Sequence, residues 1–254
     1  MKYSIIIPAH NEAQTIEEFV CQFVSVLPAS VSDVLCELII VENGSSDHTL
    51  AACKRLQGAF PCLVRVLSNE RGSYGEAIKR GILESCGSHL SILECDYLDE
   101  HFVERSIALF SSACADLIVA SKRHPESVDR RPLKRRLLTW GFNRLLNIFV
   151  GYPGSDTHGL KSIETDLAKR LCELSITTDE IFQTEIVLIA WRLGARIREV
   201  PVRIEERRTT PVSIQRRLPK VIKIVSGLRK SVERFPATDV SPVVQGQEQP
   251  RQHR

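Results

Sequence analysis

The 254-residue chain lacks a long apolar segment. Its longest uninterrupted apolar runs, such as 4–9 and 117–120, are far shorter than the roughly 20 residues that a helix needs to cross a bilayer. An apolar stretch followed by a small-residue cleavage site is also missing near the start, which argues against a secretory signal. We therefore expect a cytoplasmic protein whose membrane contact would be peripheral, at the inner face of the membrane.

Closely spaced cysteine pairs are absent as well. The chain has eight cysteines, but they are scattered, form no C-x-x-C pair and lie mostly in apolar runs. A disulfide framework usually shows regular cysteine spacing in a small secreted domain. We therefore predict reduced, buried thiols.

Aromatic residues make up only 6% of the chain, and the formal net charge is +3. The charge is unevenly distributed, since residues 1–121 carry 8 basic and 16 acidic groups and residues 122–254 carry 26 basic and 15 acidic groups. A basic half favours contact with the phosphates of a lipid, a nucleic acid or a substrate. Because the basic residues are not interleaved with aromatics and no nucleic-acid-binding motif is present, we expect no nucleic-acid partner.

Apolar positions recur with strand-like and helix-like spacing in alternation along the chain. The expected strands are 2–9, 37–41, 63–67, 89–93, 116–120 and 196–202. One expected helix directly follows the first strand. The other expected helices cover 47–56, 74–85, 100–111, 132–149, 181–193 and 214–232. Such alternation predicts an α/β fold with a central mixed, mostly parallel sheet flanked by helices. Residues 1–232 would form a single domain, and 233–254 a disordered tail.

Sheets of this kind bind ligands at the carboxyl ends of their strands, so the loops there are the candidate site. The residues of interest in the first two loops are Pro8, His10, Glu12, Glu42 and Asn43. Local structure explains part of this pattern, because Asn11 can cap a helix and Glu12 suits the helix dipole. A turn around Gly44 explains part of the second loop.

Two glycines open the helix after the third expected strand. Glycine lets a backbone approach a ligand closely, and a helix N-terminus favours an anion. Gly72 and Gly75, with Arg71 beside them, therefore suit a pyrophosphate, although a glycine before a helix is common in α/β proteins.

Acidic residues follow the fourth expected strand. Glu94 and Asp96 stand at positions i and i+2 and can present hard oxygen ligands to Mg²⁺ or Mn²⁺. We take Asp96 as the first candidate for a direct ligand and Asp99 as a secondary one. Glu94 can hold the metal directly, bind it through a water or contact a ribose. The alternative is an acidic turn that only caps the following helix.

In this order and spacing, the loops resemble the nucleotide-binding half of glycosyltransferase family 2, in the branch of the dolichyl-phosphate (polyprenyl-phosphate) mannosyltransferases. The family's Pro-x-x-Asn-Glu segment matches 8–12. Glu42 and Asn43 stand where the family usually has two aspartates, and its Asp-x-Asp segment reads Glu94-Cys95-Asp96. Segments 132–137, 154–161, 184–194 and 197–202 resemble the same branch, so the resemblance covers about residues 1–230.

The resemblance implies a fold, a donor and a cofactor. The fold is a single GT-A type, Rossmann-like domain with a nucleotide-sugar-binding half at 1–121 and an acceptor-side half at 122–232. The donor is a UDP- or GDP-sugar, held by the loop residues Pro8, His10, Glu12, Glu42, Asn43, Gly72, Gly75 and Glu94. Asp96, with Glu94, would bind Mg²⁺ or Mn²⁺, which neutralises charge on the departing diphosphate, and Arg71 would assist. Displacement would invert the anomeric carbon.

The resemblance also implies an acceptor, for which a polyprenyl phosphate is one candidate, and residues that contact this acceptor. The expected acceptor or phosphate contacts are Arg123, Asp156, Lys161, Arg207 and Arg208. A phosphate acceptor needs no general base, because it is already ionised near neutral pH. A hydroxyl acceptor needs one, and Glu185 is the candidate, unless it forms a structural ion pair with Arg192 or another arginine.

Two expected helices, 132–149 and 214–232, mix basic and apolar residues. Such helices can lie in an anionic lipid interface, or their apolar faces can close the core or a dimer contact. We weigh both alternatives equally for the first helix and favour core packing for the second. A catalytically weakened family member that binds nucleotide sugars as a sensor or partner subunit is the alternative to an enzyme.

Overall fold

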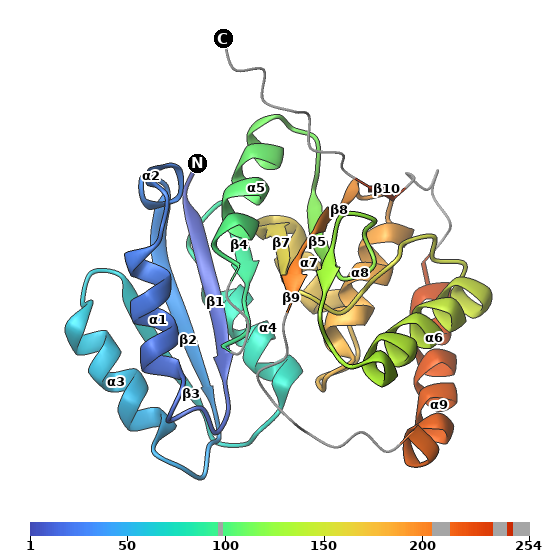
Figure 1. Ribbon diagram of the computed structural model, residues 1–254, viewed down its shortest axis with the longest axis horizontal. Coiled ribbons are helices and arrows are strands. Elements are labelled where there is room, and N and C mark those ends of the chain that lie inside the picture. Colours follow the sequence, from blue (N-terminus) through green and yellow to red (C-terminus); the bar gives the residue numbers. More distant parts are fainter. Residues whose placement is uncertain (96–98, 205–213, 236–242, 246–254) are drawn as a thin grey trace.

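A central sheet with helices on both faces organises the protein in the computed structural model, which describes residues 1–95, 99–204, 214–235 and 243–245 (Figure 1). The strands of the first half are β1 (Tyr3–Ala9), β2 (Leu35–Asn43), β3 (Val64–Asn69) and β4 (His89–Ile92). Its helices are α1 (Ile16–Ser25), α2 (Ala29–Ser32), α3 (Thr49–Ala59), α4 (Tyr74–Glu84) and α5 (Glu100–Ser111).

The second half completes the sheet and adds helices. Its strands are β5 (Leu117–Ser121), β6 (Val128–Asp129), β7 (Lys161–Glu164), β8 (Ile197–Pro201), β9 (Arg203–Ile204) and β10 (Val244–Gln245). Its helices are α6 (Leu133–Val150), α7 (Thr165–Leu174), α8 (Phe182–Arg192) and α9 (Ile214–Glu233). The sequence did not predict β7, because Lys161, Ser162 and Glu164 give this short strand no apolar alternation.

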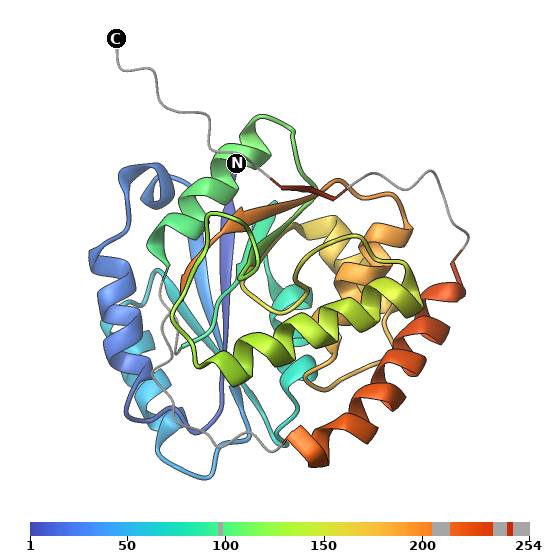
Figure 2. The same ribbon diagram turned by 45° about the vertical axis from the view of Figure 1, so that its right-hand side comes forward.

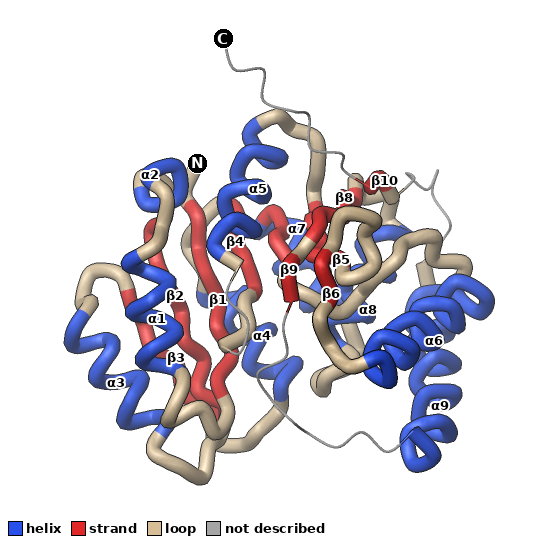
Figure 3. Tube along the Cα trace, in the orientation of Figure 1, coloured by secondary structure: helices blue, strands red, loops and turns tan. Residues whose placement is uncertain are grey.

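Within the described ranges, the main sheet has the strand order β10-β8-β5-β7-β4-β1-β2-β3. β7 runs antiparallel to both of its neighbours, β4 and β5, and the other pairs are parallel. The expected mixed, mostly parallel α/β sheet is therefore confirmed. Because β1, β2, β3 and β4 run the same way, the loops that follow them lie at one edge of the sheet (Figure 3).

Successive side chains of a strand point to opposite faces of the sheet, and each face has its own core. On β1, Ile5 and Ile7 belong to the apolar cluster that α1, α3 and α5 cover. Ile6, between them, belongs to the cluster formed with α4, α7 and α8. α9 packs against α6 and α8 on this second side, and Figure 2 shows α6 and α9 side by side. Its buried Val225 confirms the core packing that we favoured for this helix.

The end of the chain departs from the sequence-based expectation of a disordered tail at 233–254. Val244–Gln245 form β10, which pairs in parallel with β8. Without this pair, β8 would expose an edge of unpaired backbone groups, and β10 covers that edge. Residues 236–242 and 246–254 lie outside the described part of the chain.

Cysteine exposure is more varied than we expected. All eight cysteines are free thiols, as predicted. Cys53, Cys95 and Cys172 are buried, but Cys21, Cys62 and Cys86 are exposed.

In the described part of the chain, no helix has the length and apolar character needed to span a membrane.

Two helical glycines test the packing of α4 on the sheet. A Cβ on Gly81 would lie 2.5 Å from Cγ2 of Ile6, whereas a Cβ on Gly58 of α3 would meet no heavy atom within 4 Å. Both Gly→Ala changes gain helix propensity, about 1 kcal/mol. We expect Gly81→Ala to be less stable than Gly58→Ala by about 1–3 kcal/mol, because only Gly81→Ala overpacks the core. Urea unfolding of both variants measures this difference, and equal stabilities would contradict the packing described here.

Candidate functional site

A cleft of about 860 Å³ opens at the carboxyl-end edge of the sheet. Of the residues proposed from the sequence, it is lined by Pro8, His10, Glu12, Asn43, Gly72 and Glu94. The second half contributes Arg135, His158, Gly159, Asp179, Glu180 and Gln183. The cleft therefore lies between the two halves of the chain, where the loops after β1, β2, β3 and β4 meet the segments before β7 and α8.

The first three loops are tied to one another by His10 and Asn43. Nδ1 of His10 lies 2.8 Å from the carbonyl oxygen of Asn43, which can only accept, so Nδ1 carries the proton. The side-chain oxygen of Asn43 accepts a hydrogen bond of 2.9 Å from the backbone N–H of Ser73. A Cβ on Gly72 would lie 3.2 Å from the carbonyl oxygen of Asn43. Glycine at position 72 therefore lets the third loop pack closely on the second.

Gly75 has a different role from the one we expected. A Cβ there would lie 2.5 Å from the carbonyl carbon of Thr178, so the close approach is to the protein's own backbone, in the segment before α8. The backbone N–H of Glu76 and the hydroxyl of Ser73 both donate to the carbonyl oxygen of Thr178. The start of α4 is thus fixed against the other half of the chain.

Two carboxylates of the first two loops, Glu42 and Glu12, are held by hydrogen bonds from serine and threonine residues. Glu42 is 3% exposed and accepts from the N–H of Ser45 (2.6 Å) and the hydroxyl of Ser68 (2.7 Å). Burial alone would raise the pKa of Glu42, but these hydrogen bonds outweigh it and hold the pKa below its ordinary value. Glu12 accepts from the hydroxyl of Thr15 at 2.5 Å. Glu42 therefore shapes the second loop rather than lining the cleft.

A chain of hydrogen bonds runs from Glu94 in the cleft to the buried Lys161. The hydroxyl of Tyr74 donates to Oε1 of Glu94 at 3.1 Å, and Nε2 of Gln183 donates to the hydroxyl of Tyr74 at 2.5 Å. Nζ of Lys161 donates to Oε1 of Gln183 and, at 2.9 Å, to the carbonyl oxygen of Gly159. Glu94 is therefore oriented by residues from both halves of the chain. No pattern in the sequence indicated these roles of Tyr74 and Gln183.

Burial and charge set the titration of Lys161 and His158. Burial, and then the nearby Lys122, lower the pKa of Lys161 to about 7, while Asp156 and Glu94 act in the opposite direction. Burial, and then Lys161, lower the pKa of His158 to about 4, so its imidazole is neutral at pH 7. Lys161 is fully buried, which argues against the direct phosphate contact that we expected from it.

Asp156 also has a structural position. Its carboxylate is fully buried, lies 3.3 Å from Nζ of Lys122 and accepts from the backbone N–H of His158 at 2.9 Å. Burial raises the pKa of Asp156, but the charge of Lys122 and these hydrogen bonds bring it below its ordinary value. Glu199 of β8 holds the same turn, accepting from the N–H of Ser155 at 2.6 Å. Segment 197–202 is part of the family resemblance, but nothing in the sequence indicated this role of Glu199.

The structure argues against Glu185 as a catalytic base. Glu185 is fully buried on α8. Its carboxylate accepts from the backbone N–H groups of Ile176 (3.1 Å) and Thr177 (2.8 Å), and from the hydroxyl of Ser231 on α9. Among its described contacts there is no arginine, so the alternative ion pair with Arg192 is absent too. Glu185 instead anchors the segment before α8, which carries Asp179 and Glu180 to the cleft.

The remaining predicted residues lie apart from the cleft or outside the described residues. Arg71 is exposed in the third loop, and Arg123 is exposed beside a smaller basic cavity of about 260 Å³ that Lys122, His124, Arg131 and Arg136 also line. Asp99 caps α5, accepting from the N–H of Phe102 at 2.9 Å, and pairs with Arg105 at 3.1 Å. This supports the helix-cap alternative for Asp99. Asp96, Arg207 and Arg208 lie outside the residues that the structure describes.

The anchoring role of Glu185 predicts a loss of stability on substitution. Glu185→Gln replaces one acceptor oxygen by an NH₂ group that faces other donors, so we expect the free energy of unfolding to fall by about 1.5–3 kcal/mol. The exposed Glu173 of α7 is the matched control, and Glu173→Gln should change stability by less than about 0.5 kcal/mol. Denaturant unfolding gives both values. An unchanged stability of Glu185→Gln would speak for a catalytic rather than an anchoring carboxylate.

Solved structures share this fold. The structure of glucosyl-3-phosphoglycerate synthase from Mycobacterium tuberculosis in complex with Mg²⁺ and uridine-diphosphate superposes with a TM-score of 0.65 at 21% identity, over 91% of this chain and 79% of that one. Its complex with Mn²⁺, uridine-diphosphate and glucosyl-3-phosphoglycerate gives a TM-score of 0.63 at 21% identity, over 92% and 81% of the two chains. The fold is therefore the GT-A fold that the family resemblance implied.

Curated relatives and a family model match the sequence itself. Glycosyltransferase AglD of Haloferax volcanii is 27% identical over 85% of this chain and 35% of its own length. The dolichyl-phosphate beta-glucosyltransferase of Saccharomyces cerevisiae is 26% identical, over 78% of this chain and 65% of its own. The chain thus spans about a third to two thirds of the length of these relatives. The model of the family described as "Glycosyl transferase family 2" matches residues 4–163. That match covers more than half of the sequence, and the chain belongs to glycosyl transferase family 2.

Proposed function

We propose that the protein transfers a sugar from a nucleoside-diphosphate sugar to a polyprenyl phosphate at a membrane surface, with Mg²⁺ or Mn²⁺ as cofactor. The observation that carries the proposal is the cleft of about 860 Å³ in which the loops after four strands converge. Pockets for small ligands have volumes of about 300–1,000 Å³. A nucleotide sugar is a ligand for which a cleft of this size, at the carboxyl ends of parallel strands, has room.

The donor set at the cleft fits a hard divalent cation. Glu94 lines the cleft, and its Oε1 accepts from Tyr74 while Oε2 has no hydrogen-bond donor among the described residues. Carboxylate oxygens are the ligands that Mg²⁺ and Mn²⁺ prefer. We propose that Glu94 and Asp96 hold the ion. When bound, it would neutralise charge on the departing diphosphate.

The residues of this chain would orient the reactants and provide a polar environment. Tyr74, Gln183 and Lys161 keep the Glu94 carboxylate in one orientation by the chain of hydrogen bonds described above. A phosphate acceptor is already ionised near neutral pH, so the reaction needs no proton abstraction. This agrees with the buried, fully engaged carboxylate of Glu185. A single displacement on this plan inverts the anomeric carbon.

The relatives narrow the choice of substrates. The dolichyl-phosphate beta-glucosyltransferases of Saccharomyces cerevisiae and Trichomonas vaginalis are named for a lipid-phosphate acceptor and a glucosyl group. One solved structure of the same fold contains Mn²⁺ and uridine-diphosphate-glucose. We therefore place UDP-glucose first among the donors and a polyprenyl phosphate first among the acceptors.

One face of α6 supports a membrane setting. Its side chains are 50% to 70% exposed at Leu133, Leu137, Trp140, Ile148 and Phe149. The first four recur with helical spacing, and basic residues such as Arg136 and Arg144 lie among them. Arg135 of the same helix lines the cleft. A helix that exposes apolar and basic side chains suits an anionic lipid interface, and α6 would place the cleft beside it.

Donor binding should depend on the metal. We expect UDP-glucose with Mn²⁺ to stabilise the protein by about 2.7 kcal/mol at a hundredfold excess over the dissociation constant, seen as a rise in melting temperature. Asp96→Ala should remove the Mn²⁺-dependent part of this rise, because it removes a proposed ligand. Asp99→Asn is the matched control and should keep it, since Asp99 caps α5.

Three results of this experiment would count against the proposal. A full shift in Asp96→Ala would exclude Asp96 as a metal ligand. A larger shift with GDP-mannose than with UDP-glucose would overturn the choice of donor. Assays of transfer and hydrolysis complete the test. A protein that binds the donor but neither transfers its sugar to a polyprenyl phosphate nor hydrolyses it would be the catalytically weakened sensor or partner subunit.

Membrane association should depend on the exposed face of α6. We expect Leu137→Ser combined with Trp140→Ser to weaken binding to vesicles with anionic lipid by about tenfold or more, since each buried apolar side chain contributes about 1.5–3 kcal/mol. Leu83 of α4 is 54% exposed and serves as the control, so Leu83→Ser should bind as the wild type does. Vesicle flotation measures the bound fraction. Equal binding of the two variants would exclude α6 as the contact surface.

A further inference from the structure

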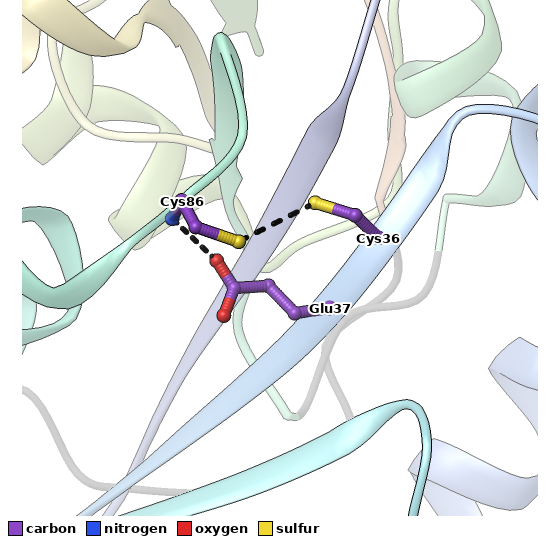
Figure 4. Close-up of side chains that lie close together, drawn as sticks. All are labelled: Cys36, Glu37 and Cys86. Carbon is purple, nitrogen blue, oxygen red and sulfur yellow. Dashed lines mark hydrogen bonds between the residues drawn. The ribbon is translucent and has the colours of Figure 1, made fainter.

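Two thiols and a carboxylate meet at the edge of the sheet opposite the cleft. Cys36 and Glu37 lie near the start of β2, and Cys86 lies in the short connection between α4 and β4. Figure 4 shows the three side chains pointing toward one another. The two Sγ atoms are 3.9 Å apart, and one ligand atom from each residue lies within 4.8 Å of the others. We propose that Cys36, Glu37 and Cys86 form a binding site for a thiophilic divalent cation such as Zn²⁺, with water as the fourth ligand.

The spacing of the sulfur atoms suits a tetrahedral ion. With Zn–S bonds of about 2.3 Å, two thiolates on one tetrahedral zinc lie about 3.8 Å apart, which is close to the observed separation. A disulfide would require the sulfur atoms to approach to about 2.0 Å. A disulfide would also not involve the nearby Glu37 carboxylate, whereas thiolate and carboxylate are both common zinc ligands.

The carboxylate is held in place by its surroundings. Oε1 of Glu37 accepts from the hydroxyl of Ser4 and from the backbone N–H of Cys86, each at 2.7 Å. Nη1 of Arg65 lies 3.3 Å from Oε2, and the Glu37 side chain is only 9% exposed. Metal-binding carboxylates are usually oriented by such partners. These hydrogen bonds use three of about four lone-pair positions, so one remains for an ion.

Backbone packing fixes the position of the third ligand. The N–H of Gly87 donates to the hydroxyl of Ser4 at 2.9 Å. A Cβ on Gly87 would lie 2.7 Å from the backbone nitrogen of Ser4, so this connection lies directly on β1. Cys86 is therefore brought to Cys36 and Glu37 by the fold itself. Its exposed side chain leaves a path from solvent for the ion and for a water ligand.

The charges of the proposed site balance. On binding, each thiol loses its proton to solvent as its sulfur bonds to the metal. Two thiolates and the Glu37 carboxylate then face a dication and the Arg65 guanidinium, and the charges of these five groups sum to zero. Arg65 also pairs with the more exposed Glu84 at 3.1 Å. The bound ion would join the start of β2 to the connection before β4, at the edge of the sheet opposite the donor cleft, and its binding is independent of sugar transfer.

Cobalt substitution tests the site directly. The full chain is reduced, freed of metal and titrated with Co²⁺, and the thiolate-to-cobalt charge-transfer absorption is recorded. We expect one equivalent of Co²⁺ to give this absorption and Zn²⁺ to displace it. Cys36→Ser and Cys86→Ser should abolish it, and Glu37→Gln should weaken zinc binding by about tenfold or more. Cys62→Ser, another exposed thiol, and Cys95→Ser, beside the cleft carboxylates, should leave it unchanged.

Three outcomes would overturn the proposal: no thiolate absorption with the reduced wild type, an absorption that survives in Cys86→Ser, or a Cys36–Cys86 disulfide mapped in protein isolated without reductant. Circular dichroism checks that each variant is folded. Cys86→Ser changes an exposed side chain, so it decides the matter if Cys36→Ser does not fold. The site would stand even if the proposed sugar transfer were wrong, because the absorption does not depend on catalysis.

Discussion

The position of the cleft depends on the direction of β7. Because β7 runs antiparallel between β4 and β5, its first residue, Lys161, lies beside Ile92, the last residue of β4. The segment before β7 therefore arrives at the carboxyl-end edge of the sheet, and His158 and Gly159 become part of the cleft wall. A parallel strand in this place would carry the same residues to the opposite edge. One reversed strand thus brings the second half of the chain to the loops that the first half supplies.

Buried polar groups hold that arrangement. A buried charge without a partner is costly, so Asp156 and Glu199 constrain the turn before β7 by requiring Lys122 and the backbone N–H groups that they bind. Lys161 is satisfied by oxygen acceptors alone, and one of these, Gln183, extends the contact to Tyr74 and Glu94. Packing of the second half and orientation of the proposed metal ligand therefore rest on the same side chains.

The sequence predicted most of the first half because its signals are local. Apolar periodicity located β1 to β4, and the rule for parallel sheets placed Pro8, His10, Glu12, Asn43, Gly72 and Glu94 at one edge, where they line the cleft. The errors concern long-range contacts. Gly75 meets Thr178, Glu185 meets Ser231, and Lys161 is buried, and no pattern of neighbouring residues carries that information. β10 was missed for the same reason, since it depends on the free edge of β8.

A crystal of the protein grown with Mn²⁺ and UDP tests the central claim that this cleft is the donor site. Anomalous scattering locates the manganese without reference to the protein side chains. We expect a manganese peak bonded to the carboxylates of Glu94 or Asp96, with the nucleotide along the loops of His10 and Asn43. A manganese peak elsewhere, or a nucleotide outside this cleft, would contradict it.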